Sequence, residues 1–198
     1  MPQVAADYRI NIYLREPGAI YVNLYVPSTL RSTDNGNPFT LTQEGDYPYE
    51  DRVTFTLTSS RPTQLTVHFR IPEWAEGASI HLNGVRQFAV VAAGQFAQIR
   101  RIWKTGDRVE LELPLRMRLE PVDARHPNTV ALLRGPLVLM AVKQEQDGPA
   151  PRVTREQLLA ARRVSEREWQ VISSDGQLSL LPFTSIGERP YTTYLNLA

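Results

Sequence analysis

The sequence predicts an all-β fold, mainly antiparallel, of the β-sandwich or jelly-roll-like type, with one or two short helices. Apolar and polar residues alternate with a period of two in several separate segments, which is the pattern of strands with one buried face. Turn residues separate these segments at short intervals, as in sandwiches and barrels rather than βαβ units. The 198 residues suffice for one large β domain or two small ones.

The first dozen residues differ from the rest because their apolar side chains recur at helical spacing. These side chains are Val4, Ala5, Tyr8 and Ile12. We therefore predict an amphipathic helix over 4–12. Because such a helix would expose its apolar face in isolation, we also expect the chain to self-associate or to lose order at its N-terminus.

Strand patterns begin at Ile20 and recur along the chain. The clearest alternating segments are 20–26, 53–58, 65–71 and 109–113. Asn83-Gly84 follows another short apolar segment, and this dipeptide suits a two-residue hairpin because both positions need positive φ. The first hundred residues thus read as a succession of half-buried strands.

The second half of the chain has a different pattern. Apolar residues are nearly continuous over 130–142, on both sides of Arg134-Gly135-Pro136, which predicts a strand covered on both faces. Thr154 and Gln157 have the spacing of a capping box and predict a short helix near 154–163. Together with Pro121, these features indicate a break in the chain near residue 121.

Composition excludes several functions. Lys and Arg number 22 against 21 Asp and Glu, a net charge of +1, so nothing favours nucleic acid as a partner. The apolar segments are too short and too interrupted to cross a membrane, and the first twenty residues lack the apolar core of a secretory signal. We expect a soluble chain. The sequence has no cysteine, which excludes disulfides, thiolate nucleophiles and Cys-bound zinc.

Two carboxylates could carry glycoside hydrolysis. Glu110 and Glu112 are two residues apart on a predicted strand, so they share a face at about 7 Å. The same face carries Arg108 and Arg116. We favour a solvated, charge-paired strand face over a catalytic pair.

The histidines and one acidic turn give no metal-site pattern. His68, His81 and His126 are scattered without the spacing that preforms a metal site, and we interpret His68 and His81 as ordinary polar residues of a surface or groove. Residues 34–37 resemble the start of a calcium loop but lack its downstream acidic ligand. We interpret them as a plain turn.

Aromatic residues are the remaining candidates, because sugars stack on exposed Trp and Tyr rings. The rings considered are Tyr47, Tyr49, Trp74, Trp103 and Trp169. Core or interdomain packing is the favoured interpretation for such large side chains. Tyr49, Trp74 and Trp103 are the candidates for carbohydrate contact.

An ordered set of segments spans nearly the whole chain and resembles one family. The segments are 20–28, 47–53, 69–75, 82–84, 99–107, 134–138 and 189–194. Together they are similar to the β-L-arabinofuranosidase-type glycoside hydrolases, formerly a domain family of unknown function. The resemblance implies a catalytic (α/α) barrel before these sandwiches, with a cysteine nucleophile beside a zinc bound by Cys and Glu. We assign no catalytic residue, metal ligand or cofactor to this chain and expect the zinc in the missing barrel.

The resemblance also suggests how the chain is divided. Residues 1–16 would be a remnant helix from the end of the barrel, and 17–120 a first sandwich. Residues 121–187 would form a second, smaller sandwich, with a final strand in 188–198 returning to the first.

The function expected is that of a non-catalytic accessory region that supports the barrel and its substrate cleft. A stand-alone carbohydrate-binding module is the alternative, and a small glycosidase using Glu110 and Glu112 is a third interpretation. The partners considered are the missing barrel, a carbohydrate and a second copy of the chain. Whether the parent is cytoplasmic or periplasmic is left open, as is its glycan specificity.

Overall fold

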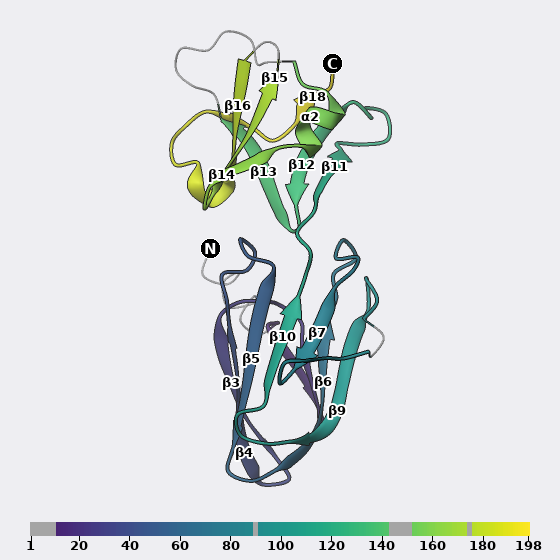
Figure 1. Ribbon diagram of the computed structural model, residues 1–198, viewed down its shortest axis with the longest axis vertical. Coiled ribbons are helices and arrows are strands. Elements are labelled where there is room, and N and C mark those ends of the chain that lie inside the picture. The colour runs from purple at the N-terminus through teal and green to yellow at the C-terminus, as the bar shows by residue number, and fades with distance from the viewer. Residues whose placement is uncertain (1–10, 89–90, 143–151, 174–175) are drawn as a thin grey trace. The chain divides into compact units, whose positions relative to one another are not determined.

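The computed structural model describes residues 11–88, 91–142, 152–173 and 176–198 (Figure 1). The chain divides into two compact units, Met1–Pro114 and Leu115–Ala198, which we name unit 1 and unit 2. The all-β prediction is confirmed. The strands β2 and β6 pair in parallel, and every other strand pair in these residues is antiparallel.

Unit 1 contains two sheets. The four-stranded sheet has the order β1-β2-β6-β9, with β1 (Tyr13–Glu16), β2 (Ala19–Val22), β6 (Thr63–Arg70) and β9 (Phe96–Trp103). The six-stranded sheet has the order β3-β4-β5-β10-β7-β8. Its strands are β3 (Ser28–Asp34), β4 (Asn37–Glu44), β5 (Arg52–Ser59), β10 (Arg108–Glu112), β7 (Ser79–Leu82) and β8 (Val85–Arg86).

Inward side chains from both sheets form one core, so unit 1 is a sandwich. Alternate residues of β5 and β6 are almost completely buried in one cluster: Val53, Phe55, Leu57, Leu65, Val67 and Phe69. Phe55 and Phe69 meet between the layers with ring centroids 5.0 Å apart. Burying each such side chain stabilises the fold by about 1.5–3 kcal/mol. The predicted period of two therefore reflects a real division between an inner and an outer face.

The two predicted tight turns connect neighbouring strands. Asn83 and Gly84 both have positive φ and join β7 to β8, as predicted. The side-chain Nδ2 of Asn83 donates a hydrogen bond to the Asp107 carboxylate at 2.8 Å. The side-chain Oδ1 of Asn83 accepts a hydrogen bond from the backbone N–H of Arg108 at 2.8 Å. The acidic segment 34–37 is the hairpin turn between β3 and β4, again as predicted.

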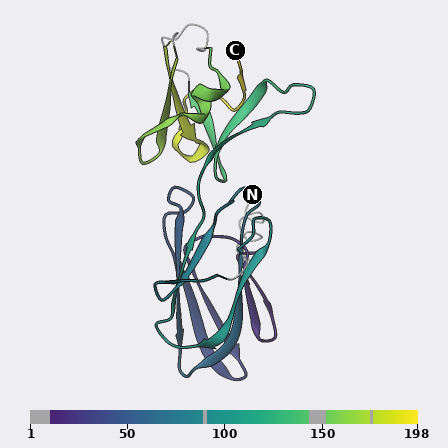
Figure 2. The same ribbon diagram turned by 45° about the vertical axis from the view of Figure 1, so that its right-hand side comes forward.

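Unit 2 is built on an eight-stranded sheet with the main order β11-β12-β13-β16-β15-β14. The strands of this path are β11 (Met117–Pro121), β12 (Thr129–Arg134), β13 (Leu137–Val142), β16 (Gly176–Pro182), β15 (Glu168–Ser173) and β14 (Arg162–Ser165). The hairpin of β11 and β12, teal in Figure 2, lies at one end of this strand order, where β12 pairs with β13 and β18. A short 3₁₀ helix, η1 (Phe183–Ser185), follows β16.

The apolar segment 130–142 is a hairpin rather than one strand. It contributes β12 and β13, and Gly135 turns between them with φ 54°. The predicted capping box is present, because the Thr154 hydroxyl accepts the N–H of Gln157 and the Gln157 side chain accepts the N–H of Thr154. The helix that follows, α2 (Arg155–Leu159), is shorter than predicted.

Two predictions about the ends of the chain need correction. The final segment was expected to return to the first sandwich, but β17 (Tyr191–Thr192) and β18 (Leu195–Asn196) pair with β13 and β12 of unit 2. Leu195 is buried there, opposite Val130. At the other end, Tyr13–Glu16 is a strand rather than part of a helix, because it pairs with β2. The helix predicted over 4–12 lies outside the described residues except for 11 and 12.

Two glycines give a test of the backbone of the six-stranded sheet. Gly45, after β4, has φ +141°, and an added Cβ would lie 2.8 Å from the Arg52 carbonyl oxygen. Gly36 has φ +74° but open space around it. We expect Gly36→Ala to lower the free energy of unfolding by about 1 kcal/mol, because alanine is disfavoured in the left-handed backbone conformation. Gly45→Ala should lower it by about 3 kcal/mol, because backbone atoms must also move. Urea unfolding of both variants measures the difference, and equal losses of stability would contradict this explanation.

Candidate functional site

Trp103, a predicted sugar contact, is a core residue. Only 1% of it is exposed, and its indole N–H donates to the Leu65 carbonyl oxygen at 3.0 Å. The Arg101 guanidinium lies 5.6 Å from the centre of its ring. Trp103 therefore has no face available for a ligand, in agreement with the favoured packing interpretation.

Tyr49 and Trp74 are half-buried and lie in different loops of unit 1. Trp74 follows β6 and packs against the core. Tyr49 lies between β4 and β5, where its backbone N–H donates to the carbonyl oxygen of Asp46 at 2.8 Å. Sugar contact at these two residues stays a prediction.

The carboxylates of β10 are paired with cations. Glu112 accepts a hydrogen bond from Arg52 at 2.6 Å and another from Ser79 at 3.0 Å, and Glu110 pairs with Arg108 at 3.0 Å. The hydrogen bond from Arg52 lowers the pKa of Glu112, and partial burial opposes it. The β10 face is therefore charge-paired as predicted, but the partner of Glu112 is Arg52 of β5 rather than the predicted Arg116.

The three histidines lie apart. The His126 ring bonds the Asp123 carboxylate at 2.8 Å, His81 lies opposite Glu110 across a strand pair, and His68 is on the other sheet. Within the described ranges, no group of three or more His, Cys, Asp or Glu residues could hold a metal ion. The zinc that the resemblance implies stays a prediction.

A mixed aromatic and polar cluster covers the outer face of the four-stranded sheet. Leu14, Tyr21, His68 and Gln98 occupy one row across β1, β2, β6 and β9, because each is the register partner of the next. The rings of Tyr21 and His68 are stacked, with centroids 4.1 Å apart and planes 8° apart. The parallel pairing of β2 with β6 thus places two outward rings side by side.

Phe96 and Glu16 complete this cluster. The Phe96 ring meets the edge of Tyr21 at 5.4 Å with an interplanar angle of 86°, and 38% of Phe96 is exposed. The Tyr21 hydroxyl donates to Glu16 at 2.7 Å. We name the set Glu16, Tyr21, His68, Phe96 and Gln98 the Tyr21 face.

The polar groups of the Tyr21 face are available to a ligand. The His68 imidazole and the Gln98 amide make no hydrogen bond with any described part of the protein. Burial lowers the pKa of His68, and the nearby Glu16 carboxylate opposes this in part. A neutral imidazole offers one donor and one acceptor, which matches the hydrogen bonding of hydroxyl groups.

Sequence reasoning placed His68 correctly on a polar strand face but missed this cluster. Tyr21 and His68 are far apart in the chain, and the alternation of each strand says only that both point outward. Their contact depends on which strands are neighbours. The only signal in the sequence was an aromatic residue at an outward position of β2, β6 and β9.

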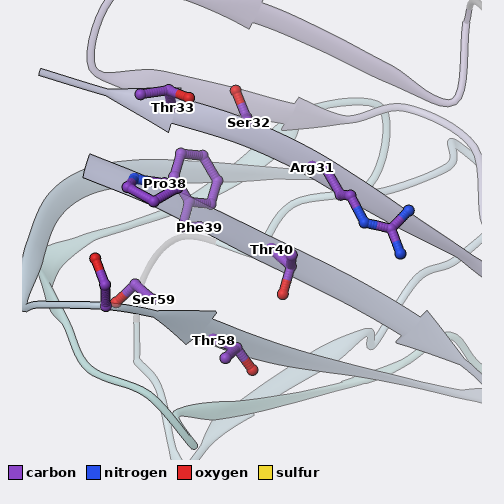
Figure 3. A pocket seen from close by; sticks show the side chains of 9 residues that line it. Arg31, Ser32, Thr33, Pro38, Phe39, Thr40, Thr58 and Ser59 are labelled. Carbon is purple, nitrogen blue, oxygen red and sulfur yellow. The ribbon is translucent and has the colours of Figure 1, made fainter. Parts of the chain in front are cut away.

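An open groove lies on the six-stranded sheet, with a volume of about 550 Å³. Figure 3 shows Arg31, Thr40 and Thr58 extending from three adjacent strands, where they form one register row. Two hydroxyl groups of this groove already form hydrogen bonds within the protein. Ser59 donates to the backbone carbonyl oxygen of Arg61, and Ser60 donates to the side-chain Oδ1 of Asn37. The groove offers hydroxyl groups and one cation, with Phe39 buried below it.

Comparison with known proteins gives a family for unit 1. The model of the β-L-arabinofuranosidase GH127 middle domain matches residues 19–115. A GH127 β-L-arabinofuranosidase from Geobacillus stearothermophilus T6 is similar to the chain, with a TM-score of 0.78 and 23% identity over 100% of this chain and 37% of that chain. No curated protein sequence matches.

Two further solved structures share the fold. One is a glycoside hydrolase with a TM-score of 0.76 and 24% identity, over 94% of this chain and 37% of that chain. The other is a GH127 β-arabinofuranosidase with a TM-score of 0.71 and 20% identity, over 94% of this chain and 36% of that chain. The chain thus spans little more than a third of these structures.

None of the helices in the described residues has the length and apolar character of a membrane span.

The protonation of His68 can be measured directly. We expect its ring to titrate below the ordinary value of 6.5, because burial disfavours the charged form. Glu16→Gln should lower the pKa further, since it removes a charge that favours protonation. NMR titration of the imidazole protons measures both values, with Glu44→Gln on the other sheet as the control. A midpoint above 6.5, or no response to Glu16→Gln, would contradict this description.

Proposed function

Because residues 19–115 are a middle domain of the GH127 β-L-arabinofuranosidase type, we propose that the chain is a non-catalytic accessory region of such a glycoside hydrolase. The family match carries this proposal, since it covers almost all of unit 1. The carboxylates on β10 support it, because each forms an ion pair with an arginine.

In this proposal the region supports a catalytic barrel and one side of its substrate cleft. The three similar structures support it, since about two thirds of each has no counterpart in this chain. A chain without cysteine supplies no thiolate, so a zinc held by thiolates would belong to the barrel. The substrate of the parent would be an arabinofuranoside of the plant type.

The alternative function is a stand-alone carbohydrate-binding module. It requires a binding surface that works without the barrel. The half-exposed rings of Tyr49 and Trp74 and the Tyr21 face are the surfaces available for it.

The non-catalytic role predicts that the purified chain does not hydrolyse aryl β-L-arabinofuranosides. Release of the aryl group is the measurement, with the buffer rate as the reference. Hydrolysis above that rate that disappears in Glu110→Gln would contradict the proposal and support the third interpretation, a small glycosidase.

The supporting role predicts the behaviour of a chimera based on the Geobacillus enzyme. Replacing the corresponding region of that enzyme by this chain should preserve folding and hydrolysis, whereas deleting the region should lower both, because the barrel would lose buried contacts. Thermal unfolding and turnover of the two variants are the readouts. A deletion variant as stable and active as the intact enzyme would show that no support is needed.

A further inference from the structure

We propose that the Tyr21 face is a binding site for a neutral oligosaccharide of arabinofuranose units. This inference rests on the proposed function for the choice of sugar. The site itself is argued from the outer face of the four-stranded sheet, and it differs from the aromatic residues that the sequence suggested.

The sheet holds the ligand-facing groups in fixed positions. Tyr21, His68 and Gln98 are register partners on three adjacent strands, so their backbones span roughly 10 Å at the usual strand spacing. The backbone N–H of Thr66 donates to the carbonyl oxygen of Gly18 at 3.0 Å, which fixes the start of the parallel pairing. A row built on paired strands needs little ordering on binding, and this favours affinity.

The chemistry of the face matches a sugar. Phe96 and Leu14 are 38% and 45% exposed and provide apolar contact for the C–H groups of a sugar ring. On the same face, the His68 imidazole and the Gln98 amide make no hydrogen bond with the described protein and offer both donors and acceptors. A few polar groups among apolar ones are typical of small-molecule sites.

Charged groups of both signs lie beside the row, and the row itself is neutral. The Glu16 carboxylate accepts a hydrogen bond from Tyr21 and lies beside the row, where it would repel an acidic sugar. Arg70, the register partner of Phe96, donates through its Nε to the Asn23 carbonyl oxygen at 2.8 Å. Arg100 lies one row away, opposite Thr66. The charged groups thus flank the row, and the neutral hydrogen-bonding side chains of His68 and Gln98 lie within it.

The other surfaces fit a sugar less well. Trp103 is buried. The groove at Arg31 has no exposed aromatic ring among its lining residues. Phe183 and Tyr191 of unit 2 are exposed and meet edge to face at 6.2 Å, but Tyr191 has the apolar Val142 as its register partner on β13.

Calorimetric titration of the whole chain with arabinotriose tests the proposal. His68→Phe keeps an aromatic ring against Tyr21 and removes both ring nitrogens, so it should weaken binding about tenfold, the effect of one lost hydrogen bond. Gln98→Ala should weaken binding to a similar extent. His81→Phe, a matched change on the outer face of the other sheet, should leave the affinity unchanged.

NMR of the wild-type chain gives a second readout that does not depend on the stability of variants. Titration with arabinotriose should shift the signals of Tyr21, His68, Phe96 and Gln98 first. Absence of binding, shifts centred on Tyr49 or Trp74, or tighter binding of an acidic oligogalacturonide would each overturn the proposal. None of these results would affect the accessory role, which depends on the hydrolysis and chimera measurements.

Discussion

The strict alternation of buried and exposed residues in unit 1 determines which side chains can meet a ligand. Val67 and Phe69 of β6 are completely buried, so His68 between them must point outward. The same constraint turns Tyr21 outward between Ile20 and Val22. A shift of either strand by one residue would exchange its inner and outer faces. The ring and its polar group would then enter the core, which costs several kcal/mol of folding free energy. The outer face of the sheet is therefore a consequence of how the core is packed.

The parallel pairing of β2 with β6 adds the second constraint. It brings the outward rings of these strands into a stack, and the antiparallel pairing of β6 with β9 adds Gln98 and Phe96 to the same surface. The six-stranded sheet has a different outer face, with threonines on β5 and the ion pairs of β10. The two faces of the sandwich thus offer different chemistry on one shared core.

Local features of this fold could be predicted from the sequence. The alternation at 53–58 and 65–71 located β5 and β6, and Asn83-Gly84 located a hairpin, because each pattern reports the backbone of its own residues. The pairing partners could not be predicted in the same way. The final strands pair with β12 and β13, and no local pattern distinguishes that arrangement from a return to unit 1.

The candidate site shows the same limit. The burial of Trp103 agrees with the packing favoured for large rings, whereas the contact between Tyr21 and His68 depends on strand order. Glu110 and Glu112 show both outcomes, because Glu110 pairs with Arg108 of its own strand as predicted, whereas Glu112 pairs with Arg52 of β5, which the sequence did not indicate. Sequence reasoning succeeded where partners lie on one strand and failed where they lie on different ones.

The central claim is that the outer face of the four-stranded sheet contacts sugar. A crystal structure of the chain soaked with arabinotriose tests it most directly. We predict a sugar ring against Phe96, with hydroxyl groups bonded to His68 and Gln98. A sugar bound instead against Trp74, or in the groove at Arg31, with the Tyr21 face empty, would contradict the claim.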